Sequence, residues 1–293
     1  MTAIFHKGKD LKKEIELYDS EFFLLRDFIY EKTGIFIRDN KKYLLKNRLT
    51  NRIKELNLNS FEEYYFFLKY DSGKKEEIEH LFSVVSTNET CFFRNYPQIE
   101  IYRQHIIPEI LEKKTKNKDN KLRIWSAGCS TGEEPYTLIM ILCEILGREI
   151  NKWNIKISAN DLSSNAIKSA QRGIYTSYTL RNTPQYYLDK YFTEQKQDVY
   201  QIDSGIKKYI SFSTLNLNNN IEIKKIEAAD IIFCRNVIIY FNEEMKRKVA
   251  NIFYDKLYPG GYLFIGHSES LHNISRAFKP CYYPGTIVYK KED

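Results

Sequence analysis

Apolar residues in the first 85 positions recur every three or four residues, which is the spacing of amphipathic helices. In the clearest case, Leu45, Leu49 and Ile53 mark one face of a helix expected over residues 41–56. Three more helices are expected: one capped by Ser20 and ended by Gly34, one over residues 61–70 behind a capping box of Ser60 and Glu63, and one from Lys75. The pattern predicts an all-helical unit over residues 1–85.

From residue 122 onward, short apolar runs alternate with helical patterns, which is typical of a parallel sheet covered on both faces. Strands are expected over residues 122–126, 155–159, 209–212, 230–234 and 262–266, with helices over 133–146, 163–173 and 243–257, and a hairpin over 281–290. Residues 174–208 interrupt this alternation and are interpreted as an inserted subdomain. The lysine-rich run 113–121 is expected to be a solvated loop. The second domain is therefore placed at residues 86–293.

Composition favours a globular protein of the reducing cytoplasm. The chain has 293 residues, 43% of them hydrophobic, and a net charge of +7, which fits a basic surface or an acidic partner. No apolar run approaches the length of a membrane span, and the first 13 residues lack a signal-peptide core. The five cysteines form no C-x-x-C pair, which argues against a structural zinc site and predicts no bound metal.

The segment over residues 122–136 reads as a strand, a turn of small residues and a helix, a junction that binds cofactors in open α/β sheets. A dinucleotide cradle would need three glycines and a helix start free of acids. Here only Gly128 and Gly132 are present, and Glu133 and Glu134 open the helix. Two carboxylates repel phosphate and attract a cation. S-adenosylmethionine, which carries a sulfonium, an ammonium and no phosphate, is the cofactor class that this pattern favours.

Polar residues also follow three later strands. Asp161 ends the second strand, where a carboxylate can accept hydrogen bonds from both ribose hydroxyls; it could instead be a helix cap. Asn216 and Asn236 end further strands and could equally be turn residues. The carboxyl ends of parallel strands share one edge of a sheet, so we expect these side chains to meet there.

A third motif, T-N-E-T-C-F-F-R over residues 87–94, precedes the sheet. Together with S-A-G-C-S-T-G-E-E-P-Y over 126–136, the Asn-Leu pair at 216–217, C-R-N-V-I-I-Y-F over 234–241 and G-H-S-E over 266–269, it resembles the CheR family of chemotaxis receptor methyltransferases. The resemblance spans nearly the whole chain. It implies an α/β fold: a Rossmann-like S-adenosylmethionine-dependent methyltransferase sheet, an all-helical N-terminal domain and a small inserted β-subdomain.

The resemblance also implies a reaction: methyl esterification of specific glutamates on the cytoplasmic helices of chemoreceptors, with S-adenosylmethionine as cofactor and S-adenosylhomocysteine as product. It implies cofactor contacts by Asn88, Thr90, Arg94, Gly128, Glu134, Asp161, Asn216, Leu217, Arg235 and Asn236. Arg94 and Tyr240 match the residues beside the reacting methyl. The insert matches the subdomain that docks on receptor tails in some members.

The motifs contain no evident general base, and this chemistry does not need one. A glutamate side chain has a reference pKa near 4.3 and is already ionised at neutral pH. Proximity and a site that excludes water should therefore account for most of the acceleration. Arg94 and Tyr240 are assigned positioning roles, without proton transfer.

The helix over residues 41–56 is strongly basic and carries a single acid, Glu55. Its basic residues could bind nucleic acid, but the resemblance favours an acidic receptor helix bundle as the partner. The residues expected to face the receptor are Lys41, Lys42, Lys46, Arg48 and Arg52.

The run Gly266-His-Ser-Glu-Ser270 is not a nucleophile elbow, because no glycine stands two positions after Ser268. The spacing of His267 and His272 does not favour a metal site. We expect His267 to satisfy backbone groups around the cofactor pocket.

Two other functions stay open at this point. A methyltransferase of the same fold could act on nucleic acid or on a small molecule, although the N/D-P-P-Y/F loop typical of many such enzymes is replaced by Arg-Asn-Val-Ile over residues 235–238. A regulator could bind S-adenosylmethionine without transferring its methyl group. The presence of Arg94 and Tyr240 argues against the second alternative.

Overall fold

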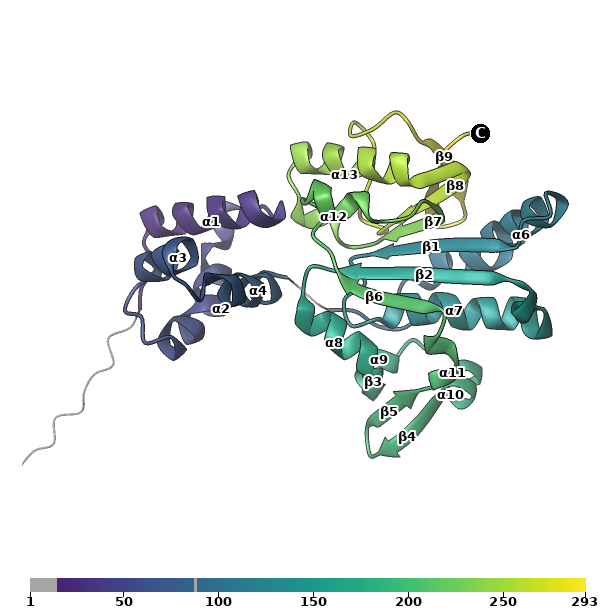
Figure 1. Ribbon diagram of the computed structural model, residues 1–293, viewed down its shortest axis with the longest axis horizontal. Coiled ribbons are helices and arrows are strands. Elements are labelled where there is room, and N and C mark those ends of the chain that lie inside the picture. Colours follow the sequence, from purple (N-terminus) through teal and green to yellow (C-terminus); the bar gives the residue numbers. More distant parts are fainter. Residues whose placement is uncertain (1–14, 87–88) are drawn as a thin grey trace, which may run out of the picture.

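A computed structural model describes residues 15–86 and 89–293. The helices of the N-terminal part form one cluster at one end of the molecule (Figure 1). They are α1 (Asp19–Thr33), α2 (Lys42–Glu55), α3 (Phe61–Tyr70) and α4 (Lys74–Val85), with a 3-10 turn (Asp39–Lys41) before α2. Their apolar faces meet in a separate core that includes the buried residues Leu25, Leu49 and Tyr64. The helical periodicity of this region is thereby confirmed.

The start of α1 differs from the prediction that Ser20 caps it. The helix begins two residues earlier than that cap implies, with Tyr18 as N-cap, and Glu21 accepts a hydrogen bond from the Tyr18 N–H at 2.8 Å. The predicted end is correct: Gly34 adopts φ 77°, a left-handed conformation that glycine adopts without a Cβ clash.

The second part is built on a seven-stranded sheet in the order β6-β2-β1-β7-β8-β10-β9. The strands are β1 (Lys121–Ala127), β2 (Asn154–Asp161), β6 (Ile210–Thr214), β7 (Ala229–Cys234), β8 (Leu257–Ile265), β9 (Lys279–Tyr283) and β10 (Thr286–Lys290). The first five strands along this order pair in parallel, and the β9–β10 hairpin adds antiparallel strands at one edge. A sheet with this order places the carboxyl ends of β1, β2 and β7 side by side.

Helices cover both faces of this sheet (Figure 1). They are α5 (Tyr96–Ile101), a π-helical turn (Tyr102–Ile106), α6 (Ile107–Lys116), α7 (Glu133–Leu146), α8 (Ser164–Arg172), α12 (Asn220–Lys224) and α13 (Glu243–Lys256). Alternation along β1 separates the two layers: Ile124 packs with the α7 side, and Trp125 packs against Phe253 of α13. Two hydrophobic layers therefore hold the strands from opposite sides.

The lysine-rich run over residues 113–121 is a loop only in part. Residues 113–116 form the last turn of α6, residues 117–120 make the connecting turn, and Lys121 begins β1. Lys114 is largely buried and its ammonium lies 2.8 Å from Asp119 and 2.9 Å from Asp230. Lysine stems can cover apolar surface while their charges find partners, so a run of lysines does not by itself exclude regular structure.

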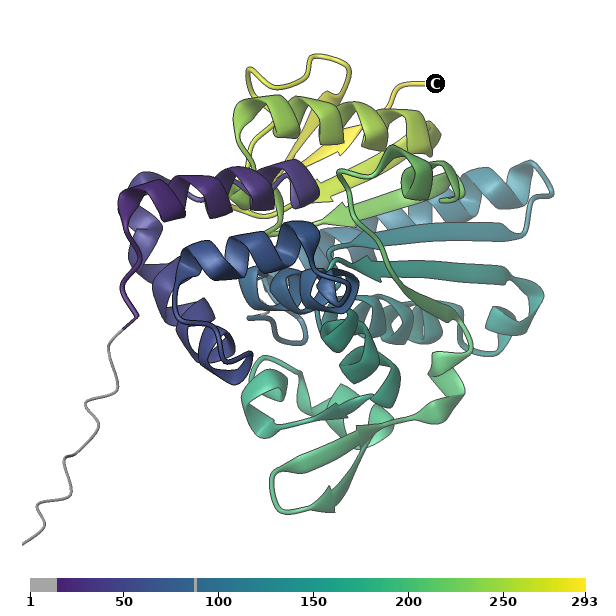
Figure 2. The same cartoon turned by 60° about the vertical axis from the view of Figure 1, so that its left-hand side comes forward.

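A small antiparallel sheet in the order β3-β5-β4 projects from the α8 side of the main sheet (Figures 1 and 2). Its strands are β3 (Ile174–Tyr175), β4 (Phe192–Lys196) and β5 (Val199–Ile202), accompanied by α9 (Ser177–Leu180), α10 (Gln185–Tyr191) and α11 (Ser204–Lys207). These elements all lie within residues 174–208, the segment interpreted as an insert.

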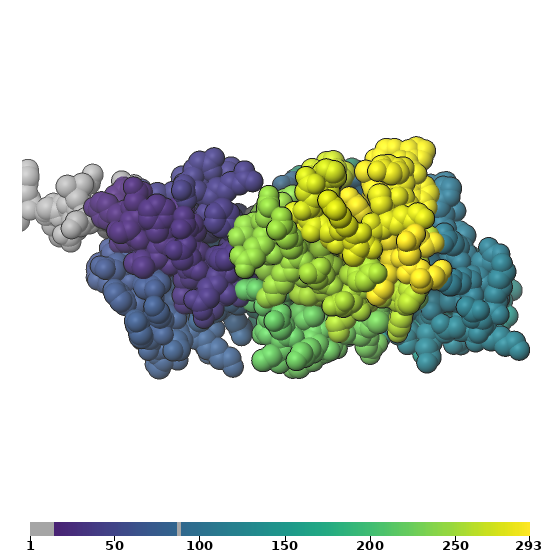
Figure 3. Space-filling model, turned by 90° about the horizontal axis from the view of Figure 1, so that it is seen from above, coloured from purple at the N-terminus to yellow at the C-terminus, as the bar shows by residue number. Residues whose placement is uncertain are grey.

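The N-terminal helices sit directly against the sheet domain (Figure 3). The backbone N–H of Phe36 donates to the Tyr240 carbonyl at 2.9 Å, and Ile35 forms a β-bridge with Phe241. At the end of α1, the side-chain amides of Asn216 and Asn218 donate to the carbonyls of Lys32 and Glu31 at 2.6 and 2.9 Å. The last turn of a helix has carbonyls without partners inside the helix, and the sheet domain provides those partners.

Among residues 15–86 and 89–293, none of the helices combines the length and the apolar character that a membrane crossing requires.

Candidate active site

A pocket lies at the carboxyl ends of β1, β2 and β7, and both domains contribute to its wall. The N-terminal domain provides Thr33, Ile35, Val85 and Ser86; the sheet domain provides, among others, Thr90, Arg94, Gly128, Glu134, Asp161, Asn216, Leu217, Arg235, Asn236 and Tyr240. All the predicted site residues that the structure describes in this region therefore line one cavity. Asn88 falls outside the described residues.

The turn after β1 brings the backbone close to the pocket. Gly128 has φ 81°, and a Cβ on it would clash with Cγ2 of Val237. The N–H groups of Gly128 and Cys129 both donate to the Asn160 carbonyl, at 2.7 and 2.9 Å. Only glycine satisfies both the conformation and the space at position 128.

Asp161 stands at the end of β2 and is held by backbone donors. Its two carboxylate oxygens accept the N–H groups of Ser130 at 2.8 Å and Ser163 at 2.9 Å. Burial raises the pKa of Asp161, and these hydrogen bonds oppose the rise. A carboxylate offers about four acceptor positions, so two hydrogen bonds leave capacity for further donors. The helix-cap alternative for Asp161 is wrong, because Ser163 is the N-cap of α8 and its hydroxyl accepts the Ala166 N–H at 3.2 Å.

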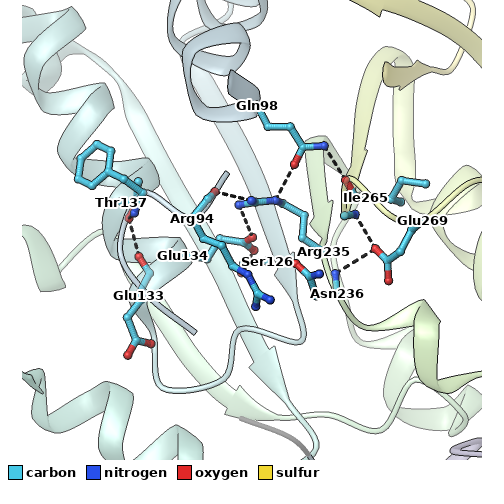
Figure 4. A network of polar contacts seen from close by, with 12 residues as sticks. Arg94, Gln98, Ser126, Glu133, Glu134, Thr137, Arg235, Asn236, Ile265 and Glu269 are labelled. Carbon is cyan, nitrogen blue, oxygen red and sulfur yellow. Dashed lines mark hydrogen bonds and ion pairs between the residues drawn. The ribbon is translucent and has the colours of Figure 1, made fainter. Parts of the chain in front are cut away.

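The centre of the polar network is the ion pair of Arg235 and Glu134 (Figure 4). The Arg235 side chain is 3% exposed; its Nη1 lies 3.3 Å from Glu134 Oε2, and its Nε donates to Gln98 Oε1 at 2.8 Å. Its Nη2 donates to the backbone carbonyl of Arg94. Ser126 donates to the other Glu134 oxygen at 2.7 Å. Arg235 thus fixes both an acid of the pocket and the segment that carries Arg94.

Burial and charge act in opposite directions on this pair. Burial raises the pKa of the Glu134 carboxyl, while the Arg235 guanidinium opposes the rise. Burial likewise lowers the pKa of Arg235, and Glu134 opposes that change. Each charge is kept in the interior by the other, which is the condition for burying an ion pair without a large net cost.

Arg94 and Tyr240 lie on the same pocket wall and are half-buried. Nη1 of Arg94 donates to the Glu89 carbonyl at 3.0 Å. Its neighbours Phe93 and Asn95 have φ values of 51° and 56°, both left-handed. Left-handed non-glycine residues are uncommon and are found where surrounding structure imposes them, so the Arg94 backbone is held in a defined shape. Tyr240 ends the 3-10 turn η4 (Ile238–Tyr240).

Asn216 makes contacts that the sequence did not indicate. Its side chain donates to Lys32 and accepts the Asn218 N–H at 2.9 Å, while its backbone N–H donates to Glu222 at 2.8 Å. Its side chain thus ties the pocket wall to α1, and the neighbouring Leu217 provides apolar surface.

The five basic residues expected to face a receptor have different surroundings. Lys42 and Lys46 pair with Asp19 and Glu16 at 2.6 and 2.8 Å, and Arg48 donates to the Val85 carbonyl at 2.7 Å. Lys41 is exposed.

Arg52 points into its own domain. Its guanidinium lies 2.6 Å from Glu77, whose side chain is 2% exposed and also accepts the Tyr64 hydroxyl at 2.7 Å. The pair links α2 to α4. Arg52 therefore has a clear structural role within the helical domain.

Two residues of the network are not among the site residues that the sequence predicts. Gln98 is buried and connects Arg235 to the Ile265 carbonyl, to which its Nε2 donates at 2.7 Å. Glu269 accepts backbone N–H groups at the pocket edge, a role that we had expected of His267, which is exposed. The G-H-S-E run contains both His267 and Glu269. A carboxylate accepts several N–H groups more readily than an imidazole does, and that chemistry could have identified Glu269.

Glu133, beside Glu134 at the start of α7, points away from this network (Figure 4). It is 1% exposed, and Thr131 donates to both its oxygens, at 2.8 and 2.7 Å. Burial raises the pKa of Glu133 from 4.5 to about 7. Because the folded-state pKa is the higher one, its contribution to stability is present below about pH 4.5 and is lost as the pH rises through 7.

We expect the variant Glu133→Gln to remove this pH dependence, since glutamine does not titrate and can still accept from Thr131. The free energy of unfolding of the wild type, relative to the variant, should fall by about 3 kcal/mol between pH 4.5 and pH 8, at roughly 1.4 kcal/mol per pKa unit. Urea unfolding at both pH values measures this, with the exposed Glu112→Gln as control. Parallel changes in wild type and Glu133→Gln would contradict the prediction.

Comparison with known proteins agrees with this geometry. The model of the CheR methyltransferase all-alpha domain matches residues 20–86, and that of the CheR methyltransferase SAM binding domain matches residues 88–286. The two models together leave only short terminal segments unmatched.

Several named relatives match over most of their length. Chemotaxis protein methyltransferase 2 of Vibrio cholerae is 37% identical over 266 residues, covering 90% of both chains. The chemotaxis protein methyltransferase of Borreliella burgdorferi is 36% identical over 94% of this chain and 96% of its own. That of Escherichia coli is 30% identical over 92% of this chain and 90% of its own.

Proposed function

The chain belongs to the CheR methyltransferase family, and from this premise we propose that it esterifies specific glutamate side chains on the cytoplasmic helices of chemoreceptors. It is an S-adenosylmethionine-dependent methyltransferase that acts in chemotactic adaptation. The acceptor glutamates and the role of each site residue are the proposed part. A cytoplasmic location follows from this proposal, because the receptor segments concerned are cytoplasmic.

The chemistry of the pocket fits the cofactor. Asp161 keeps acceptor capacity for ribose hydroxyls, and Glu134 offers a carboxylate for an ammonium group. Leu215 and Leu217 supply apolar surface suited to an adenine ring. Thr90, Gly128 and Asn236, also on the wall, would complete the contacts. When bound, S-adenosylmethionine supplies a methyl group on a positively charged sulfur.

The protein's own residues are proposed to bind, orient and exclude water. An acceptor glutamate is ionised at neutral pH, so the chain need not remove a proton from it. Arg94 orients a carboxylate, either that of the acceptor or that of the cofactor, through its planar guanidinium. The Tyr240 hydroxyl orients either the acceptor glutamate or the cofactor. Closing these groups around the reacting atoms lowers the barrier mainly through proximity and loss of water.

The observation that carries this proposal is the single pocket in which Glu134, Asp161, Arg94 and Tyr240 meet. These residues come from four separate sequence motifs. The pocket supplies acceptors for a cationic cofactor and positioning groups for an acceptor, and the proposed reaction needs both.

We propose that the receptor approaches over α2 and the 3-10 turn before it, with Lys41, Lys42, Lys46 and Arg48 steering an acidic helix face. Arg52 is also among the five residues expected to face the receptor, but we expect it to contribute least, because its guanidinium is paired with Glu77.

In the methylation assay below, Lys41→Glu should raise the KM for the receptor severalfold and leave kcat unchanged, since charges at the rim of an interface act mainly on the rate of encounter. Lys118→Glu, at an exposed position between α6 and β1 and outside both proposed receptor contacts, is the matched control. The small β3-β5-β4 sheet is a second proposed contact, for a receptor tail.

The experiment that tests the function is transfer of labelled methyl from S-adenosylmethionine to a receptor cytoplasmic fragment, followed by mild base. Label that base releases as methanol identifies a carboxyl methyl ester, and we expect nearly all of it in that form. Base-stable label would point instead to another acceptor atom. Cofactor binding with no transfer to the fragment would favour a different substrate or a sensing role.

A further inference from the structure

The carboxylate of Glu269 accepts hydrogen bonds from three backbone N–H groups. Its Oε2 accepts from Asn236 at 2.9 Å and from Gly266 at 2.5 Å, and its Oε1 accepts from Ile239 at 3.1 Å. Asn236 and Ile239 both lie in the segment that runs from β7 into η4, and Gly266 follows β8. One side chain therefore joins two separate stretches of backbone at the edge of the pocket, and Figure 4 shows its contact with Asn236.

Gly266 makes this approach possible. A Cβ at this position would lie 2.7 Å from Glu269 Oε2 and 2.9 Å from the Asn236 nitrogen. The Glu269 N–H also donates back to the Gly266 carbonyl at 2.9 Å, which closes a tight turn. The glycine and the glutamate three residues later thus form one structural unit, whereas His267 and Ser268 between them are exposed.

The backbone held by Glu269 is the loop that carries pocket residues. Asn236, Val237 and Tyr240 all line the pocket, whereas Glu269 does not. Asn236 has φ 60°, a conformation that needs support from its surroundings. Ile239, which directly precedes Tyr240, is 45% exposed, so packing of its side chain contributes little to holding η4. The hydrogen bond from its N–H to Glu269 is the stronger restraint.

We propose that Glu269 is a positioning residue for methyl transfer, which fixes the loop over residues 236–240 so that Asn236 and Tyr240 face the cofactor and the acceptor. The inference rests on the proposed function, because that reaction defines what is positioned. It adds a residue that acts through backbone geometry and touches neither substrate nor cofactor.

Glutamine is the informative replacement at this position. It matches glutamate in size, but its amide has one acceptor oxygen and one donor nitrogen. Three N–H groups converge on two oxygens, so the amide nitrogen must face at least one of them. At least one hydrogen bond is therefore lost, while the packing of the side chain is retained.

We expect Glu269→Gln to lower kcat about tenfold, since small displacements of reacting groups can cost one to two orders of magnitude. The KM for the receptor fragment and the affinity for S-adenosylhomocysteine should change less than about threefold. His267→Ala, the matched control in the same turn, should leave all three unchanged. Glu269→Asp keeps the charge but is one methylene shorter, and it should also lower kcat; this variant takes over if the glutamine variant does not fold.

A double-mutant cycle separates positioning from general support of the fold. In a Tyr240→Phe background, Glu269→Gln should lower kcat by a clearly smaller factor, because the group that it misplaces is already gone. Equal factors in both backgrounds would overturn the proposal. So would an unchanged kcat in folded Glu269→Gln, or the same loss in His267→Ala.

Hydrogen exchange tests the backbone part without any acceptor. We expect amides of residues 236–240 to exchange faster in Glu269→Gln than in wild type and His267→Ala. If the wild type failed to methylate the receptor fragment, the proposed function would fall, yet faster exchange would still support the role of Glu269 in the loop. Unchanged exchange would overturn that role, whatever the substrate.

Discussion

Replacing Arg94 by alanine is expected to lower kcat about 100-fold on a receptor fragment, because it removes the group that we propose aligns a carboxylate with the reacting methyl. The binding of S-adenosylhomocysteine should weaken by no more than about tenfold, since the other groups of the pocket wall remain. Calorimetric binding and saturating methylation assays give the two numbers separately. Arg103→Ala, which removes an arginine paired with Glu100 outside the pocket, is the control.

The two numbers also separate the possible roles of Arg94. A large loss of kcat with near-normal binding identifies an acceptor-orienting residue. Strong loss of binding with normal kcat at saturation would mean that Arg94 only holds the cofactor. Full turnover and full affinity together would contradict the assignment altogether.

Replacing Arg235 by methionine should have the largest effect on stability. The substitution leaves Glu134 buried without its counter-charge and removes the hydrogen bond to the Arg94 carbonyl. Loss of one partner from a buried pair costs about 3–5 kcal/mol, so we expect the free energy of unfolding at pH 7 to fall by about that amount. Urea unfolding measures it, and methylation should be lost in parallel because the Arg94 segment is released.

The cause can be checked with a second substitution and with pH. Arg235→Met combined with Glu134→Gln removes both charges and should recover part of the lost stability. Without Arg235, the largest opposition to the effect of burial is gone, so the pKa of Glu134 rises further above its ordinary value of 4.5, although the Ser126 hydroxyl and Arg94 still oppose part of the rise. A raised folded-state pKa costs stability as pH rises through it, so the deficit of Arg235→Met should be largest at neutral pH and shrink in acid. A deficit that is independent of pH and unchanged in the double variant would point to packing instead.

Local patterns in the sequence were sufficient for much of the fold. The period of Leu45, Leu49 and Ile53 predicted α2, and the apolar run before Gly128 predicted β1. The residues at strand ends, Asp161 among them, were placed correctly on one edge of the sheet, because parallel strands impose that arrangement whatever their order.

Contacts between distant segments could not be predicted in this way. The sequence predicts that Arg52 faces a receptor, because its partner Glu77 lies 25 positions away on another helix and is not apparent from local spacing. The side chain of Asn216 was assigned to the pocket, yet it also holds the end of α1, 184 positions away. The lysine-rich run predicts a loop at Lys114, because its distant partner Asp230 is contributed by β7. In each case a polar side chain found its partner only through the tertiary fold.

The asparagine contacts at the end of α1 have a thermodynamic consequence. Asn216 lines the pocket and also donates a hydrogen bond to the last turn of a helix in the other domain, and Thr33 and Ile35 of that domain complete the wall. Any ligand that prefers the complete wall must therefore favour the docked arrangement, and docking must raise ligand affinity by the same factor. S-adenosylmethionine and S-adenosylhomocysteine differ by one methyl group and would share most of these contacts. A receptor helix that displaces the N-terminal domain would therefore alter the affinity for both. Cofactor exchange and receptor binding would then both depend on one equilibrium, that between the docked and undocked arrangements of the two domains.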